Sequence, residues 1–195
     1  ESFATTVVTT ATGFTQLFAA NSIFDPDQTG GGKQPRWHDQ WATIYERYYV
    51  RSAKLKWRFM DNANSYGAWK YMMIIPYADG DDPSPFTIVG PPNIDAILET
   101  SKRPGKRWYY KMCTGPGNAE PKVNSMSRKI VPAFWTKGVD DQVDNSAAFG
   151  SNPTKLVYMR CDILAPTDGS ARTYYMEFSI DYEVCIYSPK VPAQS

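Results

Sequence analysis

Strict alternation in residues 50–59 constrains the fold more than any other feature of this chain. One set of side chains is apolar and comprises Ala53, Leu55, Trp57 and Phe59. The other set is polar and mostly basic and comprises Ser52, Lys54, Lys56 and Arg58. Successive side chains of a β-strand point to opposite faces. The pattern therefore predicts a strand with a hydrophobic core on one face and a surface that tolerates positive charge on the other.

A different period precedes this strand. Asp39 is followed by Trp41, Ile44, Tyr45 and Tyr48, which recur at spacings of three to four positions and predict a short helix with its large rings on one face. The residues before it, 21–35, contain three consecutive glycines and two prolines and are typical of an extended loop.

The rest of the chain favours strands. β-Branched and aromatic residues dominate, and no window carries a long helical apolar stripe. Strands are predicted at residues 3–10, 14–19, 49–60, 69–77, 107–114, 123–131, 155–164 and 173–187. The last of these alternates most clearly, with one face predicted to be core and the other polar and mostly acidic. A short helix is predicted at 94–100 after Asn93, with loops at 78–92, 115–121 and 137–153. About eight strands of this length predict an all-β fold, a single eight-stranded jelly roll of two packed antiparallel sheets with long loops and one or two short helices.

Size and charge limit the function. The 195 residues are enough for one sizeable core, so residues 1–195 are expected to form a single domain. The 21 basic and 20 acidic residues give a net charge of +1, so any binding of nucleic acid must be local. No apolar run approaches the roughly 20 residues that span a bilayer, and membrane insertion is not expected.

The cysteines and the histidine exclude several site chemistries. Cys113, Cys161 and Cys185 match no zinc spacing or disulfide framework and are predicted to be buried free thiols. His38 is the only histidine, so a histidine-rich metal site cannot be built. We expect it in a surface loop and expect no catalytic residue, metal or cofactor.

Two loops resemble ligand sites only superficially. Residues 30–33, Gly-Gly-Gly-Lys, lack the strand, Lys-Ser/Thr pair and helix of a phosphate loop, so a flexible loop is favoured. The acidic residues 79–82 lack the spacing of a calcium loop and are read as a solvated turn, although calcium between subunits stays open.

One constellation is compatible with nucleic acid. Cationic side chains can hold phosphates while flat rings stack on unpaired bases. The candidate residues are Lys54, Lys56, Arg58, Arg107, Lys111 and Trp108. The alternative is that these side chains lie on solvated strand faces or at subunit contacts.

Several short motifs cluster between Phe18 and Phe59. They read NSIFDP at 21–26, QP at 34–35, DQW at 39–41, YERYYV at 45–50 and KLKW at 54–57. In these motifs the chain resembles the capsid proteins of circular single-stranded DNA viruses that encode a replication initiator, the circovirus-like group. The likeness is dense over these residues and looser in residues 107–112 and 173–187.

The resemblance implies a virion protein. It would be a jelly roll that assembles as about sixty identical subunits into an icosahedral, T=1-like shell around a circular single-stranded DNA genome. Its partners would be those subunits, the genome, and a host-cell receptor or glycan, and assembly would take place in the host nucleus or cytoplasm. The family carries an arginine-rich arm before its first strand, so a basic arm is expected upstream of Glu1.

Aromatic residues leave a second reading open. They make up 14% of the chain, more than a sandwich core of this size needs, and surplus rings are typical of protein interfaces or carbohydrate platforms. A jelly-roll carbohydrate-binding module or lectin is therefore the alternative, with its platform at Trp37, Trp41, Trp108 or Trp135. An enzyme on this fold is a third reading, which the single histidine disfavours.

Overall fold

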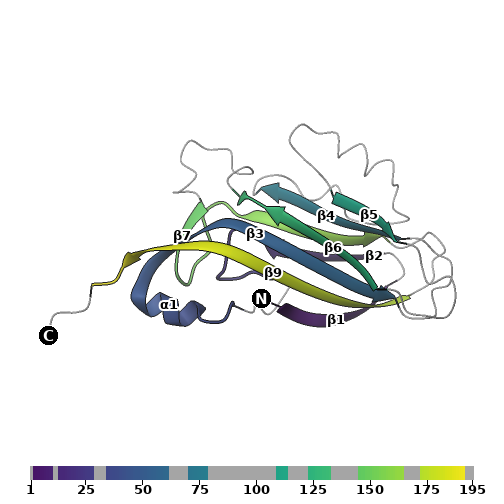
Figure 1. Ribbon diagram of the computed structural model, residues 1–195, viewed down its shortest axis with the longest axis horizontal. Coiled ribbons are helices and arrows are strands. Elements are labelled where there is room, and N and C mark those ends of the chain that lie inside the picture. The colour runs from purple at the N-terminus through teal and green to yellow at the C-terminus, as the bar shows by residue number, and fades with distance from the viewer. Residues whose placement is uncertain are drawn as a thin grey trace.

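The computed structural model describes residues 2–10, 13–28, 34–61, 70–78, 109–113, 123–132, 145–164 and 172–191. These residues form nine strands and one helix (Figure 1). The first elements are β1 (Ser2–Thr10), β2 (Gly13–Ala19), α1 (His38–Ile44), β3 (Tyr45–Asp61) and β4 (Lys70–Ala78). The others are β5 (Tyr109–Cys113), β6 (Val123–Ile130), β7 (Ser146–Ala148), β8 (Val157–Leu164) and β9 (Arg172–Pro189).

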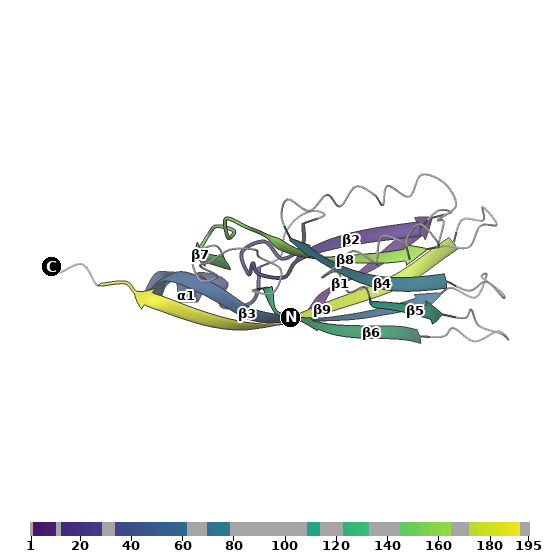
Figure 2. The same cartoon turned by 90° about the horizontal axis from the view of Figure 1, so that it is seen from above.

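The strand order is that of a jelly roll. One sheet has the order β1-β9-β3-β6 and the other has the order β2-β8-β4-β5, with every pairing antiparallel. The two sheets form two layers (Figure 2). Most strands that follow one another in the chain lie in opposite sheets, and β4 and β5 pair as direct neighbours. The strand order of the two sheets is that of the double Greek key of this fold. The predicted all-β jelly roll is confirmed, with the short β7 added beside β3.

Strands β3 and β9 form the centre of the first sheet. They pair from Tyr45 opposite Pro189 to Asp61 opposite Tyr174, and both extend beyond the second sheet (Figures 1 and 2). β1 pairs with β9 on the side away from β3. β6 and β7 pair with β3 on the side away from β9. The first sheet is therefore organised around this one pair.

A β-bulge in β3 connects two parts of the core. Tyr48 and Val50 are buried, and so are Leu55 and Trp57, but the alternation changes phase between them. The register with β9 shifts between Val50 and Ser52, where one extra residue moves the side-chain alternation by one. One long strand can therefore supply Leu55 and Trp57 to one buried cluster and Tyr48 and Val50 to another.

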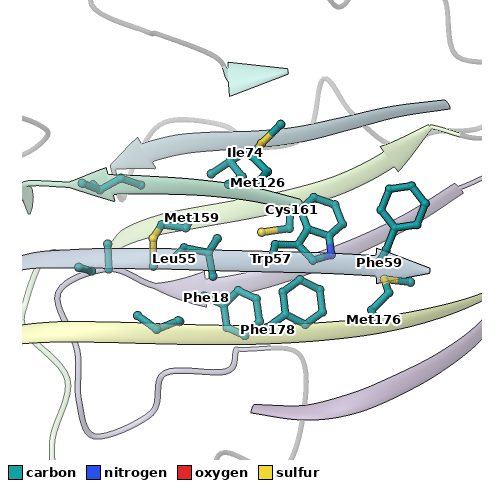
Figure 3. Close-up of a cluster of buried hydrophobic side chains, with 14 of the residues drawn as sticks. Phe18, Leu55, Trp57, Phe59, Ile74, Met126, Met159, Cys161, Met176 and Phe178 are labelled. Carbon is teal, nitrogen blue, oxygen red and sulfur yellow. The ribbon is translucent and has the colours of Figure 1, made fainter. Parts of the chain in front are cut away.

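The main core lies between the sheets (Figure 3). Trp57 of β3 stacks on Phe178 of β9 with ring centroids 5.4 Å apart, and Phe178 meets Phe18 of β2 at 5.0 Å. Both sheets thus contribute rings to one packed layer. Burying each such side chain contributes about 1.5–3 kcal/mol. The remaining members include Leu55, Phe59, Ile74, Met126, Met159, Cys161, Ile163, Met176 and Ile180.

A polar network holds the segment after β2 in place. The Asn21 side chain donates to Asn145 Oδ1 at 3.0 Å and accepts from the Val157 backbone N–H at 2.8 Å. Ser22 Oγ donates to Asn152 at 2.6 Å and lies 3.1 Å from the Tyr48 hydroxyl. Burial raises the pKa of that hydroxyl, so it stays protonated. Asn21 and Ser22 therefore act in this structure as buried anchors of a loop.

Several predicted positions need correction. β3 begins at Tyr45, so Tyr45 and Tyr48 belong to the strand and not to the helix, because Tyr48 is needed in the core. His38 is buried at the start of α1 and not in a surface loop, since its ring packs between Phe24 and Phe149. The predicted loop 137–153 contains β7, which pairs with β3.

The cysteine prediction is confirmed in part. Cys161 is a buried free thiol in the core, whereas Cys185 is free but only half-buried because it lies on the outer face of β9. The side chain of Cys113 lies outside the described part of the structure. The predicted helix at 94–100 and the loops at 30–33 and 115–121 lie outside the described residues, as does the predicted loop 78–92 apart from Ala78, which ends β4. No helix in the described part of the chain has the length and apolar character needed to cross a membrane.

We predict that Leu55→Ala lowers the free energy of unfolding by about 2–5 kcal/mol, because the side chain is fully buried in the main core. Urea denaturation measures the change. Val123→Ala, which truncates an exposed side chain of β6, is the control and is expected to change stability by less than about 0.5 kcal/mol. Equal losses in the two variants would contradict the core assignment.

Candidate functional site

The predicted nucleic-acid residues do not share one surface. Lys54, Lys56 and Arg58 point outward together from β3, as the alternation predicts. Lys111 lies in β5 of the other sheet, where its Cα is paired with that of Met72. Arg107 and Trp108 lie outside the described residues. The outer face of the first sheet is therefore the part of the predicted site that can be described.

This outer face carries acidic residues beside the basic ones. In the register of β3 with β9, Lys54 lies opposite Asp181, and Arg58 lies opposite Glu177. Lys56 Nζ contacts Asp181 at 2.6 Å, and Arg58 Nη2 contacts Glu177 at 2.5 Å. The positive face of β3 is thus largely matched by carboxylates from its own neighbour.

The ladder continues onto β6 and toward the bulge. Lys129 of β6 lies opposite Lys54 and reaches Glu183 at 3.6 Å, and Ser52 donates to Glu183 at 2.9 Å. We call the charged ladder the set Lys54, Lys56, Arg58, Lys129, Glu177, Asp181 and Glu183. Sequence patterns indicated both the basic and the acidic strand faces, but they could not reveal that these faces are adjacent.

A shallow depression lies within the ladder. Its volume is about 460 Å³, and its polar lining combines small hydroxyl side chains with longer charged ones. We call it the serine trough, and its polar lining residues are Lys56, Arg58, Ser125, Ser127, Glu177 and Ser179. Ser127 and Ser179 flank Lys56 in the sheet register, and Ser125 lies opposite Arg58. Sequence reasoning missed these serines, because their proximity to the lysines depends on strand register.

Ionisation of the ladder follows from these contacts. The hydrogen bond from Lys56 lowers the pKa of Asp181, and the charges of Lys56 and Lys54 add to this effect. The hydrogen bond from Ser52 lowers the pKa of Glu183, with the charge of Lys129 as a further cause. Both groups are therefore held in the carboxylate form near neutral pH.

A second surface is apolar and surrounds α1. Trp37, the residue just before the helix, leaves 67% of its area exposed, and Trp41 and Ile44 within the helix leave 44% and 51% exposed. We call these three residues the apolar stripe. Beside it lies a groove of about 410 Å³. The groove is lined by Ile23, Pro35, Arg36, His38, Trp41, Phe149, Ile180, Tyr182, Val184 and Ile186.

The imidazole ring of His38 is buried and does not open onto solvent. Its Nδ1 lies 3.2 Å from Asp39 Oδ1, while Nε2 is buried and has no hydrogen-bond partner in the described structure. No group of three His, Cys, Asp or Glu side chains that could hold a metal ion occurs among the described residues.

The chain is similar to solved structures from virus particles. The sequence matches no protein-family model, and a search of curated proteins finds no significant match. A T=1 subviral particle of a Penaeus vannamei nodavirus capsid protein deletion mutant is 13% identical, with a TM-score of 0.41 over 97% of this chain and 98% of that chain. Israeli acute paralysis virus gives 12% identity and a TM-score of 0.42 over 95% and 74%, respectively. An empty virus-like particle of cowpea mosaic virus is 10% identical, with a TM-score of 0.35 over 94% of this chain and 79% of that chain.

These similarities are distant, so the jelly-roll assignment depends on the strand order of this chain itself. None of the three structures is named as a circovirus-like protein.

We predict that the ladder makes stability depend on acid. A carboxyl group whose pKa is lower in the folded chain contributes stability above its unfolded pKa, near 3.8 for Asp181, and this contribution is lost as the pH falls through the folded pKa. Asp181→Asn should therefore cost about 0.2–1 kcal/mol at neutral pH, because the pair is exposed. Its cost should disappear in strong acid.

Urea denaturation at neutral pH and in strong acid tests this prediction. Glu46→Gln removes an exposed carboxylate outside the ladder and serves as the control. A cost of Asp181→Asn that persists unchanged in strong acid would show that the ion pair is not its cause.

Proposed function

We propose that this chain is a viral coat subunit that assembles with identical copies into a small icosahedral shell of about sixty subunits around a circular single-stranded DNA genome. The jelly roll alone does not decide this, because shells, lectins and cupins share it. The observation that carries the proposal is the exposed apolar stripe at α1 and the residue before it, which lies beside an apolar groove. The resemblance of residues 18–59 to circovirus-like capsid proteins supports the same reading.

The occupant of this apolar surface is proposed to be a second copy of the chain. Exposed apolar patches of this kind mark protein interfaces. Trp37 and Trp41 leave about 280 Å² exposed, if a fully exposed tryptophan presents roughly 250 Å². A standard interface buries about 800 Å² on each partner, so the stripe provides part of one contact. Arg36 and Asp39 lie beside the stripe as exposed charges of opposite sign. In a contact between two copies, the arginine of one copy can pair with the aspartate of the other.

Many weak contacts repeated by symmetry give a stable closed shell. We further propose that the chain is a virion protein with no catalytic role and that residues 1–195 form a single domain. The proposed genome contact consists of the β3 cations of the charged ladder, Lys54, Lys56 and Arg58. Arg107, Trp108 and Lys111 remain proposed as further contacts.

Carbohydrate binding is the second candidate. The exposed rings of Trp37 and Trp41 are also what a sugar platform requires. The two candidate functions predict particles of different size and different ligands. A coat subunit forms particles of many chains, whereas a carbohydrate-binding module binds glycans as a monomer or small oligomer.

We predict that the purified chain sediments as large particles and that Trp37→Ser combined with Trp41→Ser raises the concentration needed for assembly at least tenfold. The reason is the loss of the apolar contact, and a tenfold change corresponds to about 1.4 kcal/mol. Analytical ultracentrifugation over a concentration series measures it. Tyr175→Ser, which removes an exposed ring from the far end of β9, is the control and should assemble normally.

Two outcomes would count against the coat function. One is a chain that stays monomeric at every concentration while binding a glycan in a screen. The other is a double tryptophan variant that folds, as judged by its unfolding curve, and assembles like the unmodified chain.

A further inference from the structure

The cations proposed to meet the genome already have counter-ions within the protein. Lys56 contacts Asp181, Arg58 contacts Glu177, and Lys129 reaches Glu183. All of these carboxylates come from β9, which lies beside β3 along the whole ladder. A phosphate group can reach these cations only by competing with the β9 carboxylates.

We propose that the serine trough binds the backbone phosphates of single-stranded DNA, and that the β9 carboxylates are exchangeable counter-ions that limit its affinity. This inference rests on the proposed function, since it names where and how the genome is held. In the empty state Asp181 and Glu177 neutralise Lys56 and Arg58. In the bound state phosphate oxygens take their place, and the carboxylates turn toward water.

The geometry of the trough fits a phosphate chain. Lys56 and Arg58 lie two residues apart on the same face, about 6.6 Å along the strand. This is comparable with the distance between successive phosphates of an extended DNA strand. Ser127 and Ser179 lie on the two sides of Lys56, and serine hydroxyls are common donors to phosphate oxygens. Small side chains beside long cations leave room for a phosphate at the floor of the depression.

The ion pairs are weak enough to exchange. The side chains of Lys56 and Asp181 are 48% and 49% exposed, and exposed pairs of this kind contribute little to stability. The carboxylates nevertheless have a role in the empty chain. Lys54 and Lys129 lie opposite each other in the register, and like charges so placed repel unless acidic groups intervene. The carboxylates of β9 therefore offset the repulsion between the basic side chains when no DNA is bound.

Titration of single-stranded DNA against the full chain tests the proposal. The probe is a fluorescent oligothymidylate of about thirty nucleotides, long enough to exceed one binding site. Its anisotropy is followed at several salt concentrations. Glu177→Gln and Asp181→Asn are each expected to raise the affinity about three- to tenfold at low salt. A plot of the logarithm of the DNA-binding constant against the logarithm of the salt concentration should also become steeper. The slope should change by about 0.7 for each lysine or arginine that loses its carboxylate partner and contacts a phosphate.

Matched variants separate the trough from bulk charge. Glu46→Gln makes the same change in net charge as Glu177→Gln at an exposed position outside the ladder, and less than a twofold change is expected. Ser127→Ala changes no charge, and it should weaken binding several-fold while leaving the salt slope unaltered. Lys56→Gln should lower both the affinity and the slope.

Competition with inorganic phosphate identifies the source of the phosphate group. At equal ionic strength, phosphate should displace the DNA no better than chloride if the site recognises a chain of phosphates. Efficient displacement by phosphate would mean that the trough is a site for a single free anion and would overturn the assignment to DNA.

Two further results would also overturn it. One is a gain in affinity for Glu177→Gln and Asp181→Asn no larger than that for Glu46→Gln. The other is a Ser127→Ala variant that binds like the unmodified chain. Sedimentation without DNA reports assembly separately, so a failure of the trough leaves the coat function standing, whereas a chain that never assembles removes the coat function itself.

Discussion

The antiparallel pairing of β3 with β9 is the contact on which the rest of the structure depends. On the inner face it brings Trp57 onto Phe178 and Leu55 opposite Ile180. On the outer face it brings the basic side chains of one strand beside the acidic side chains of the other. Because side chains alternate, a slip of one residue would reverse both faces at once. Apolar packing and charge pairing thus select the same register.

The functional surfaces follow from this pairing. The serine trough exists because β6 and β9 place small residues on both sides of the β3 cations. The apolar groove exists because β9 continues past the second sheet. Tyr182, Val184 and Ile186 therefore line it together with residues of α1 and with Phe149, and no strand of the second sheet lines it among the described residues. The surface proposed for DNA is charged and the surface proposed for a neighbouring subunit is apolar, and β9 contributes residues to both.

Much of the fold could be predicted from local patterns. Strong alternation and turn residues indicated the eight principal strands, including the inner and outer faces of β9. The bulge at Val50–Ser52 and the short β7 could not be predicted, because neither has a periodic signal of its own. His38 was misplaced for a similar reason, since its burial depends on Phe24 and Phe149, which are distant from each other in the sequence.

The sequence by itself determined the all-β class, the two-faced character of β3 and β9, and the absence of a histidine-rich centre, since these depend only on residue identity and spacing. Tertiary structure decided which faces meet. It paired the basic stripe with the acidic one, placed Lys111 in the other sheet, and turned Trp37 and Trp41 toward solvent. Contacts between residues more than one hundred positions apart depend on strand register and sheet order, and local sequence does not encode them.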